Sequence, residues 1–310
     1  MLRTRLIVGT VLIAVLVGLS WLDHLAAIPG VWLMPALIAL VVLATQELLG
    51  LWAPNGLKPI VPVVHLGTLL VLLSAWVPVA GAMAGYAALG QPVFSVQTQS
   101  WSCPAADGWS LGALALAIVL ALLAEMARYE KPGRVTTDLA AAVFAMTYLG
   151  FLLSFVVRLR LAWGIGALAS LVVVVKMGDT GAYFFGKAIG RHRMAPALSP
   201  SKTIEGAIGA ILFSCLASWA VFRWLVPITT PLGVRSPGAL DPVWGSIIFG
   251  VVVGGAGILG DLAESLLKRD AACKDSSTWV PGLGGVLDML DSIILAAPLA
   301  YACWRLGLTG

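Results

Sequence analysis

The chain has 310 residues, of which 60% are hydrophobic and only 11% are charged, and its mean hydropathy is +0.97. This composition excludes an ordinary soluble domain and is typical of a protein that crosses a membrane several times. The net charge is +4, but no basic stretch rich in aromatic residues accompanies it, so no nucleic-acid partner is expected. The four cysteines lack C-x-x-C spacing, so they indicate neither a disulfide framework nor a zinc site.

Long apolar stretches follow one another along the chain, each about as long as the roughly 17–25 residues that a bilayer crossing needs. We expect about nine spans, at Leu6–Leu22, Val31–Trp52, Ile60–Leu89, Trp109–Met126, Leu139–Val157, Leu161–Phe185, Glu205–Val226, Val243–Leu267 and Val286–Leu306. The third is longer than needed and contains Pro62 and Pro78. The sequence therefore predicts an all-α transmembrane bundle, with residues 1–135 as an N-terminal helical part and residues 136–310 as a C-terminal part that carries loops 187–204 and 268–285.

The distribution of Lys and Arg predicts the orientation of these spans, because cytoplasmic segments carry an excess of them. With the N-terminus inside, most of the 19 Lys and Arg residues fall in inner segments, and the outer loop Gly90–Gly108 has none. We therefore expect a cytoplasmic N-terminus. This orientation places loops 187–204 and 268–285 at the cytoplasmic face.

Charged residues concentrate between Asp261 and Asp291, where an apolar protein carries them at high cost unless they have a function. If the run before residue 268 is helical, Asp261, Glu264, Ser265 and Lys268 share one face, as Asp288 and Asp291 do at the start of the last span. Two helix ends would then present the carboxylates of Asp261, Asp288 and Asp291 to one another. Facing carboxylates need a cation, and oxygen-only ligands suit Mg²⁺. The alternative is a charged loop with ordinary caps, in which Asp288 is an acid near a helix N-terminus.

The glycine-rich turn between these helix ends is typical of phosphate binding. Gly284 and Gly285 have no side chains, so their N–H groups are expected to approach a phosphate closely. Lys268, Arg269 and Lys274 supply positive charge for phosphate oxygens.

A second polar group lies between the sixth and seventh spans. Asp179 occurs deep in an apolar stretch, and Ser199-Pro-Ser201-Lys202-Thr precedes the next one. We expect Ser199 or Ser201 to cap the following helix, whose N-terminus favours an anion. The alternatives are a simple capped turn and, for Asp179, an ion pair with Lys176 or Lys187.

The run from residue 265 to residue 292 closely resembles the signature of the phosphatidate cytidylyltransferase family, also called CDP-diacylglycerol synthases. The matching residues are Ser265, Lys268-Arg269, Lys274-Asp275, Pro281-Gly282-Leu283-Gly284-Gly285, Asp288 and Asp291-Ser292. The segments that begin at Asp179 and Ser199 resemble the same family, so the resemblance covers about residues 176–300. Two places depart from it, because Leu283 and Met289 stand where the family usually has His and Arg. We therefore expect metal and basic residues, not that histidine, to carry the chemistry.

The resemblance implies the reaction of CTP with phosphatidate to give CDP-diacylglycerol and pyrophosphate, and it implies Mg²⁺ as cofactor with a second metal ion left open. It implies metal ligands at Asp261, Asp288 and Asp291 and phosphate contacts from Ser201, Lys202, Lys268, Arg269, Lys274, Gly284 and Gly285. Asp261, Asp288, Lys268 and Lys202 would be the catalytic residues, and residues 136–310 the catalytic region. For Asp179 the pattern leaves open whether it orients a basic residue or joins the metal site.

The same resemblance predicts an integral protein of a bacterial inner membrane, with its active site facing the cytoplasm. Its partners would be CTP, phosphatidate of the inner leaflet, other membrane lipid and a second copy in a homodimer. The sequence leaves open other CTP-using enzymes, such as a polyprenol or phytol kinase or an archaeal-type CDP-lipid synthase. It also leaves open a lipid transporter and an inactive scaffold.

Overall fold

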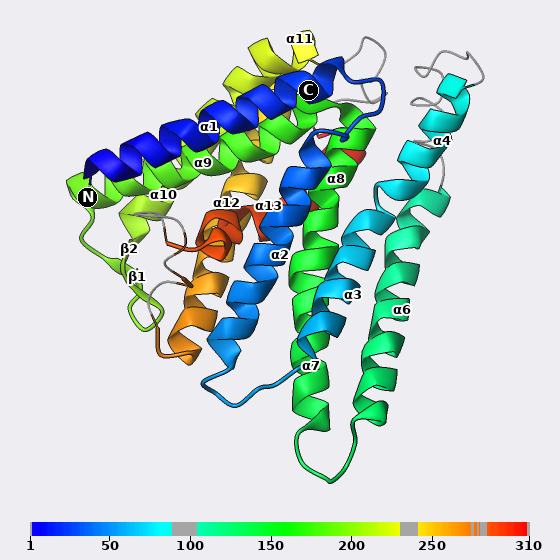
Figure 1. Cartoon of the computed structure of the whole chain (residues 1–310). Helices are drawn as coiled ribbons and strands as arrows, with labels where there is room; N and C mark the ends of the chain where they lie inside the picture. The colour runs from blue at the N-terminus through cyan, green and yellow to red at the C-terminus, as the bar shows by residue number, and fades with distance from the viewer. Residues whose placement is uncertain are drawn as a thin grey trace. The chain divides into compact units, whose positions relative to one another are not determined.

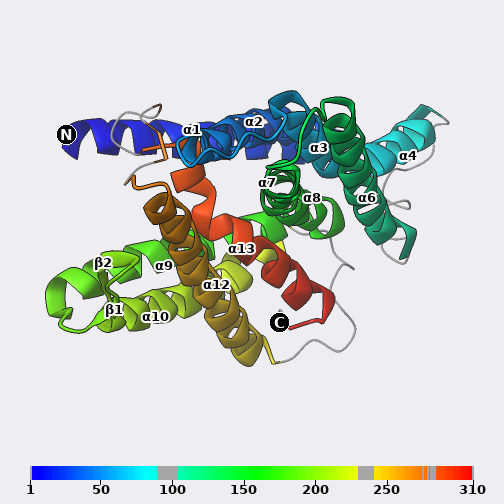
Figure 2. The ribbon, with the colours of Figure 1, turned by 90° about the horizontal axis from the view of Figure 1, so that it is seen from below.

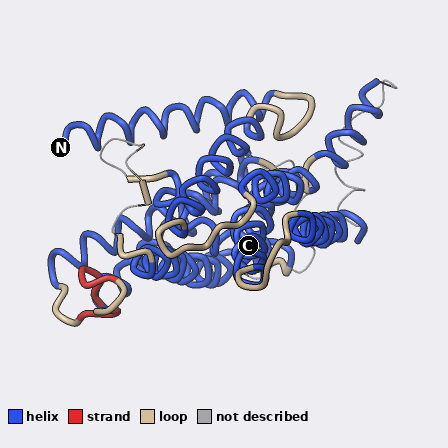
Figure 3. Tube along the Cα trace, turned by 60° about the horizontal axis from the view of Figure 1, so that its bottom comes forward, coloured by secondary structure: helices blue, strands red, loops and turns tan. Residues whose placement is uncertain are grey.

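The structure is a computed structural model of the chain, and it describes residues 2–88, 104–229, 241–273, 276–277, 279 and 284–308. Nearly all regular structure in these ranges is helical, with two short strands beside it (Figure 3), so the predicted all-helical fold is confirmed. The helices form two compact units. Unit 1 comprises Met1–Ala162 and Asp275–Met289, and unit 2 comprises Trp163–Lys274 and Leu290–Gly310. The functional division expected after residue 135 stays a prediction.

Most helices and strands of both units are labelled in Figure 1. Unit 1 contains α1 (Leu2–Leu25), α2 (Leu33–Trp52), α3 (Val61–Ser74), α4 (Val77–Ala88), α6 (Pro104–Ala127), α7 (Val135–Ala145), the π-helical turn η1 (Met146–Phe151) and α8 (Leu152–Trp163), which ends at the boundary. Unit 2 contains α9 (Ile165–Ile189), β1 (Arg193–Ala195), β2 (Ser199–Thr203), α10 (Ile204–Ala220), the π-helical turn η2 (Val221–Leu225), α11 (Val226–Thr229) and α12 (Pro242–Asp270). The last helix, α13 (Val286–Arg305), begins in unit 1 and continues in unit 2.

Eight helical stretches among the described residues are long and apolar enough to cross a membrane, and they correspond to eight of the nine expected spans. The remaining expected span, residues 60–89, is wrong as a single helix because α3 and α4 divide it. Pro78 explains the break, since proline has no N–H to donate to the preceding turn and is tolerated only in the first turn of a helix, where it lies in α4. The N–H groups of Ala75 and Trp76 instead reach back three residues, to the carbonyls of Leu72 and Leu73 at 3.2 and 3.0 Å.

Polar contacts join the connections at one end of unit 1. The N–H of Lys58, between α2 and α3, donates to Asp138 of α7 at 2.8 Å. Arg128, between α6 and α7, donates to the carbonyl of Lys58 at 3.0 Å and pairs with Glu125 at 2.7 Å. The α2–α3 and α6–α7 connections therefore lie together, as spans of alternating direction predict.

A buried ion pair joins other connections of unit 1. Asp23 is fully buried at the end of α1, and its carboxylate pairs with Arg160 of α8 at 2.7 Å. The same carboxylate accepts hydrogen bonds from the N–H groups of Gly30 and Trp32 at 3.0 and 3.1 Å. Asp23 thus fixes the α1–α2 connection to the end of α8.

In unit 2, α9 and α10 lie side by side and are joined by the antiparallel hairpin β1–β2 (Figure 2). Their backbones meet at glycines, because a Cβ on Gly181 would collide with the carbonyl oxygen of Gly209 and lie 2.7 Å from the Cβ of Phe213. Such close contact of small residues is how apolar helices associate where no water is present to drive burial.

The hairpin also determines how α10 begins. Ser199 and Ser201 belong to β2, so the expectation that either one caps α10 is wrong. Thr203 is the N-cap, and its hydroxyl accepts a hydrogen bond from the N–H of Gly206 at 3.1 Å. The extended hairpin explains why Thr203 is the N-cap, because only the last residue of β2 has its side chain within reach of the first turn of α10.

We predict that Gly181→Ala destabilises unit 2 by about 1–3 kcal/mol, because the added methyl group forces α9 and α10 apart. Thermal unfolding in detergent measures the effect. Gly255→Ala is the matched control in α12, since a Cβ there meets nothing within 4 Å. Equal melting temperatures for the two variants would contradict the close α9–α10 contact.

Candidate active site

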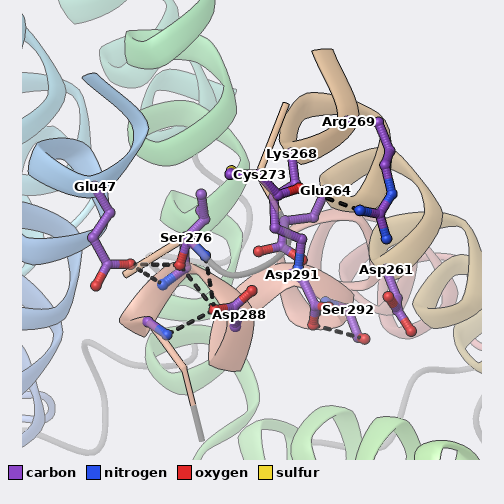
Figure 4. A network of polar contacts seen from close by, with 12 residues as sticks. Glu47, Asp261, Glu264, Lys268, Arg269, Cys273, Ser276, Asp288, Asp291 and Ser292 are labelled. Carbon is purple, nitrogen blue, oxygen red and sulfur yellow. Dashed lines mark hydrogen bonds and ion pairs between the residues drawn. The ribbon is translucent and has the colours of Figure 1, made fainter. Parts of the chain in front are cut away.

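Three acidic side chains of unit 2 come together at the facing parts of α12 and α13. Asp261 and Glu264 belong to α12 and Asp291 to α13, and one carboxylate oxygen from each lies within 4.8 Å of the others. Figure 4 shows these side chains beside one another. We call them the acidic cluster.

A glycine on α12 makes this approach possible. A Cβ on Gly260 would collide with the carbonyl oxygen of Asp291 and lie 3.0 Å from the Cα of Ser292. The backbones of α12 and α13 therefore touch beside Asp261. Glu264 follows Asp261 by one helical turn, so both carboxylates lie on the side of α12 that faces α13.

The acidic cluster is largely buried and is bordered by two lysines. Glu264 is fully buried and Asp291 is 7% exposed. Lys268, one turn further along α12, pairs with Glu264 at 2.7 Å, and Lys202 of β2 pairs with Asp261 at 2.6 Å. Three carboxylates and two ammonium groups leave one formal negative charge, in a place where buried charge is costly. The all-oxygen ligand set and this residual charge fit a hard divalent cation such as Mg²⁺.

The hairpin that supplies Lys202 is tied to the end of α12. Arg269 donates through Nε to the carbonyl of Leu198, between β1 and β2, at 3.1 Å, and through Nη1 to the carbonyl of Cys273 at 3.3 Å. Ser201 is exposed beside Lys202, with its hydroxyl 3.5 Å from that of Ser199. Lys202, Lys268 and Arg269, all expected to contact phosphate, are thus held by the two elements that border the cluster.

Asp179 forms an ion pair with Lys176, which was the alternative to a role of Asp179 in the site. Its carboxylate lies 3.1 Å from Lys176, three residues earlier on α9, and both side chains are partly exposed. A role in metal or substrate binding stays a prediction for this residue.

The carboxylate of Asp288 organises the start of α13 in unit 1. Its Oδ2 accepts hydrogen bonds from the N–H of Gly285 at 2.7 Å and from the N–H and hydroxyl of Ser276 at 3.2 and 2.9 Å (Figure 4). Asp288 is the third helical residue and reaches back to the N–H of the residue before the helix, which is one half of a capping box, since Gly285 has no side chain to return the bond. Gly284 adopts a φ of +91°, which glycine tolerates better than other residues.

Several predicted roles in this region stay predictions. These are the metal contact of Asp288 and the phosphate contacts of Gly284 and Gly285. Lys274 and residues 281–283 lie outside the described part of the chain.

The sequence did not assign a site role to two acidic residues, Glu264 and Glu47, that the structure brings into this region. The helical spacing placed Glu264 on the face of Asp261, and only the packing of α12 against α13 brings it to Asp291. The other is Glu47, which is 5% exposed in α2 and accepts four hydrogen bonds from residues 276–287. The sequence could have indicated Glu47 in one way only: it is an acidic residue within an apolar span, and such a residue usually has a function.

The fold and the acidic cluster define a polytopic membrane protein with an oxygen-rich, lysine-bordered site suited to a divalent cation and phosphate groups. Residues 3–306 match the cytidylyltransferase family, and the chain belongs to that family. The predicted family resemblance is therefore confirmed.

Several individual relatives are named phosphatidate cytidylyltransferase, which is more specific than the name of the family. The phosphatidate cytidylyltransferase of Synechocystis sp. is 27% identical over an alignment of 334 positions, which covers 94% of this chain and 94% of the relative. That of Haemophilus influenzae is 36% identical over 163 residues, covering 50% of this chain and 54% of the relative. That of Chlamydia muridarum is 38% identical over 132 residues, covering 43% of this chain and 41% of the relative. The chain thus matches about half the length of the latter two.

We predict that Mg²⁺ raises the melting temperature of the protein through the acidic cluster and that Glu264→Gln removes most of this rise. A ligand at 100 times its dissociation constant stabilises by about 2.7 kcal/mol, which a melting curve in detergent detects. Glu205→Gln is the control, because that carboxylate lies outside the cluster and binds His192 at 2.6 Å. An unchanged Mg²⁺ response in Glu264→Gln would contradict the assignment.

Proposed function

We propose that this chain is a phosphatidate cytidylyltransferase, which forms CDP-diacylglycerol and pyrophosphate from CTP and phosphatidate. The observation that carries the proposal is the family match over residues 3–306, within which a relative that bears this activity's name aligns along 94% of the chain. The acidic cluster supports the proposal. A reaction between two phosphate groups needs positive charge to offset their repulsion, and carboxylate oxygens suit the divalent cation that would supply it.

The chemistry needs no covalent intermediate on the protein. An oxygen of the phosphatidate phosphate attacks the α-phosphorus of CTP, a new P–O bond forms, and the bond to the bridging oxygen of the β-phosphate breaks. That bridging oxygen leaves with pyrophosphate and keeps the bonding electrons. The nucleophile is already an anion, so the main barrier is repulsion between two negatively charged substrates, and positioning and electrostatics lower it.

The side chains around the acidic cluster have defined roles in this proposal. Asp261, Glu264 and Asp291 would hold Mg²⁺, with Asp288 as a further predicted ligand. When bound, Mg²⁺ supplies positive charge that neutralises the triphosphate and the leaving pyrophosphate. Lys202 and Lys268 exchange their carboxylate partners in part for phosphate oxygens, and Ser201 donates a hydrogen bond beside Lys202. Arg269 keeps the hairpin at the site and faces the same substrate phosphates.

We place the site at the cytoplasmic face of a bacterial inner membrane, with the N-terminus on the same side. CTP is a cytoplasmic solute and phosphatidate stays in the leaflet, so the reacting phosphates meet at the headgroup level. The excess of Lys and Arg in the segments assigned to the inside supports this orientation. A homodimer is part of the proposal through the family resemblance.

We predict that purified protein with CTP, phosphatidate and Mg²⁺ produces CDP-lipid and pyrophosphate, and that Asp261→Asn lowers the rate about 100-fold or more. Chelation of the divalent ion should stop the reaction in the same way. Asp241→Asn is the matched control: Asp241 caps the other end of α12 by accepting from the N–H of Val243 at 2.9 Å, and asparagine caps equally well.

The products distinguish the remaining readings. Release of CDP with a newly phosphorylated lipid would replace the proposal with a lipid kinase. Absence of any nucleotide-dependent lipid product would replace it with a transporter or a scaffold.

A further inference from the structure

Glu47 lies in an apolar helix, yet its carboxylate binds a segment more than 200 residues later in the sequence. The side chain is 5% exposed in α2, where an acid is expensive unless polar partners satisfy it. Among the described residues, its four hydrogen bonds come from residues 276–287, within the stretch that resembles the family signature. We call this arrangement the Glu47 tether.

The four donors divide evenly between the two carboxylate oxygens. Oε1 accepts from the hydroxyl of Ser277 at 2.6 Å and from the N–H of Val286 at 2.9 Å. Oε2 accepts from the hydroxyl of Ser276 at 3.1 Å and from the N–H of Leu287 at 2.8 Å. An amide in this place has one acceptor oxygen and would set its NH₂ group against two donors. The site therefore requires a carboxylate.

The Glu47 tether acts on the start of α13. Val286 and Leu287 are the first residues of that helix, and their N–H groups have no partner within it. A carboxylate there satisfies both donors and interacts favourably with the positive end of the helix dipole. The start of α13, and hence the rotation of the helix about its axis, is fixed from α2.

The helix that the tether fixes carries two acidic residues of the proposed site. Asp288 is in its first turn and Asp291 follows three residues later. Ser276 links the tether directly to Asp288, because its one hydroxyl proton is shared between Oε2 of Glu47 at 3.1 Å and Oδ2 of Asp288 at 2.9 Å (Figure 4). A change at Glu47 therefore reaches both carboxylates without touching either.

We propose that Glu47 is a positioning residue of the cytidylyltransferase reaction: through Ser276, Ser277 and the first turn of α13 it holds Asp288 and Asp291 in the orientation that the cation and the nucleotide phosphates require. This inference rests on the proposed function. It predicts that loss of the tether impairs cation binding and turnover, since a displacement of about 1 Å at a reacting group costs about 100-fold in rate.

The test is Glu47→Gln, which keeps the size of the side chain and turns one oxygen into a donor. Hydrogen exchange of the amides of residues 284–288 reports the tether itself and should become at least about tenfold faster. The rise in melting temperature caused by Mg²⁺ should shrink. In the lipid assay kcat should fall about tenfold or more, with a higher Mg²⁺ concentration for half-maximal rate and a KM for CTP within about threefold of the wild type.

Asp23→Asn is the matched control. Asp23 is also a buried carboxylate of unit 1 that accepts from two backbone N–H groups, but it holds the α1–α2 connection and Arg160, far in sequence from the signature. It should lower the melting temperature at least as much as Glu47→Gln. The folded fraction should keep the wild-type kcat, Mg²⁺ dependence and exchange at residues 284–288.

Each outcome decides the inference. Wild-type kcat and Mg²⁺ dependence in folded Glu47→Gln would overturn it, as would equal kinetic losses in Asp23→Asn. If Glu47→Gln does not fold, Ser277→Ala removes the 2.6 Å hydrogen bond to Glu47, together with the 3.3 Å hydrogen bond that the same hydroxyl accepts from the N–H of Trp279. Unchanged exchange and Mg²⁺ response in that variant would also overturn the inference. A wild-type protein that makes no CDP-lipid defeats the proposed function, while exchange and Mg²⁺ binding still decide the Glu47 tether.

Discussion

The structure depends on how carboxylates are satisfied inside apolar helices. Water is scarce there, so each acid needs a fixed partner, and the partners of Asp23 and Glu47 come from distant parts of the chain. Asp23 has Arg160, Glu47 has two serines and two backbone N–H groups, and Glu264 has Lys268. The pairings of Asp23 and Glu47 join separate helices, so the same contacts that offset the cost of burial also define the fold.

Glycine determines where these helices meet. Without a hydrophobic effect between them, apolar helices associate through close van der Waals contact, and the absence of a side chain allows the closest contact. In unit 2 this occurs between Gly181 and Gly209, where α9 meets α10, and at Gly260, where α12 meets α13. The second contact places Asp261 and Glu264 beside Asp291. The acidic cluster is thus a consequence of backbone packing as much as of the acids themselves.

Polar residues around the site fix the elements that carry the site residues. Lys202 and Lys268 compensate charge in the acidic cluster, while Arg269 and the hairpin β1–β2 keep Lys202 close to Asp261. In unit 1, Glu47 and Asp288 together satisfy the start of α13. The residues proposed to contact substrate therefore lie on helix ends and on a hairpin that other polar residues have already fixed, which limits the reorganisation needed when charge moves between phosphates.

The sequence by itself determined the helical membrane class, eight of the spans and the family, because hydropathy and ordered polar motifs are local features. It also placed Asp261 and Glu264 on one helix face. Only the tertiary structure decided that Pro78 divides the third expected span, that Thr203 caps α10, and that Glu264 and Glu47 have their partners. The partners of Glu264 and Glu47 depend on which helices touch, and a single sequence records the spacing along a helix but not the neighbour that a face will meet.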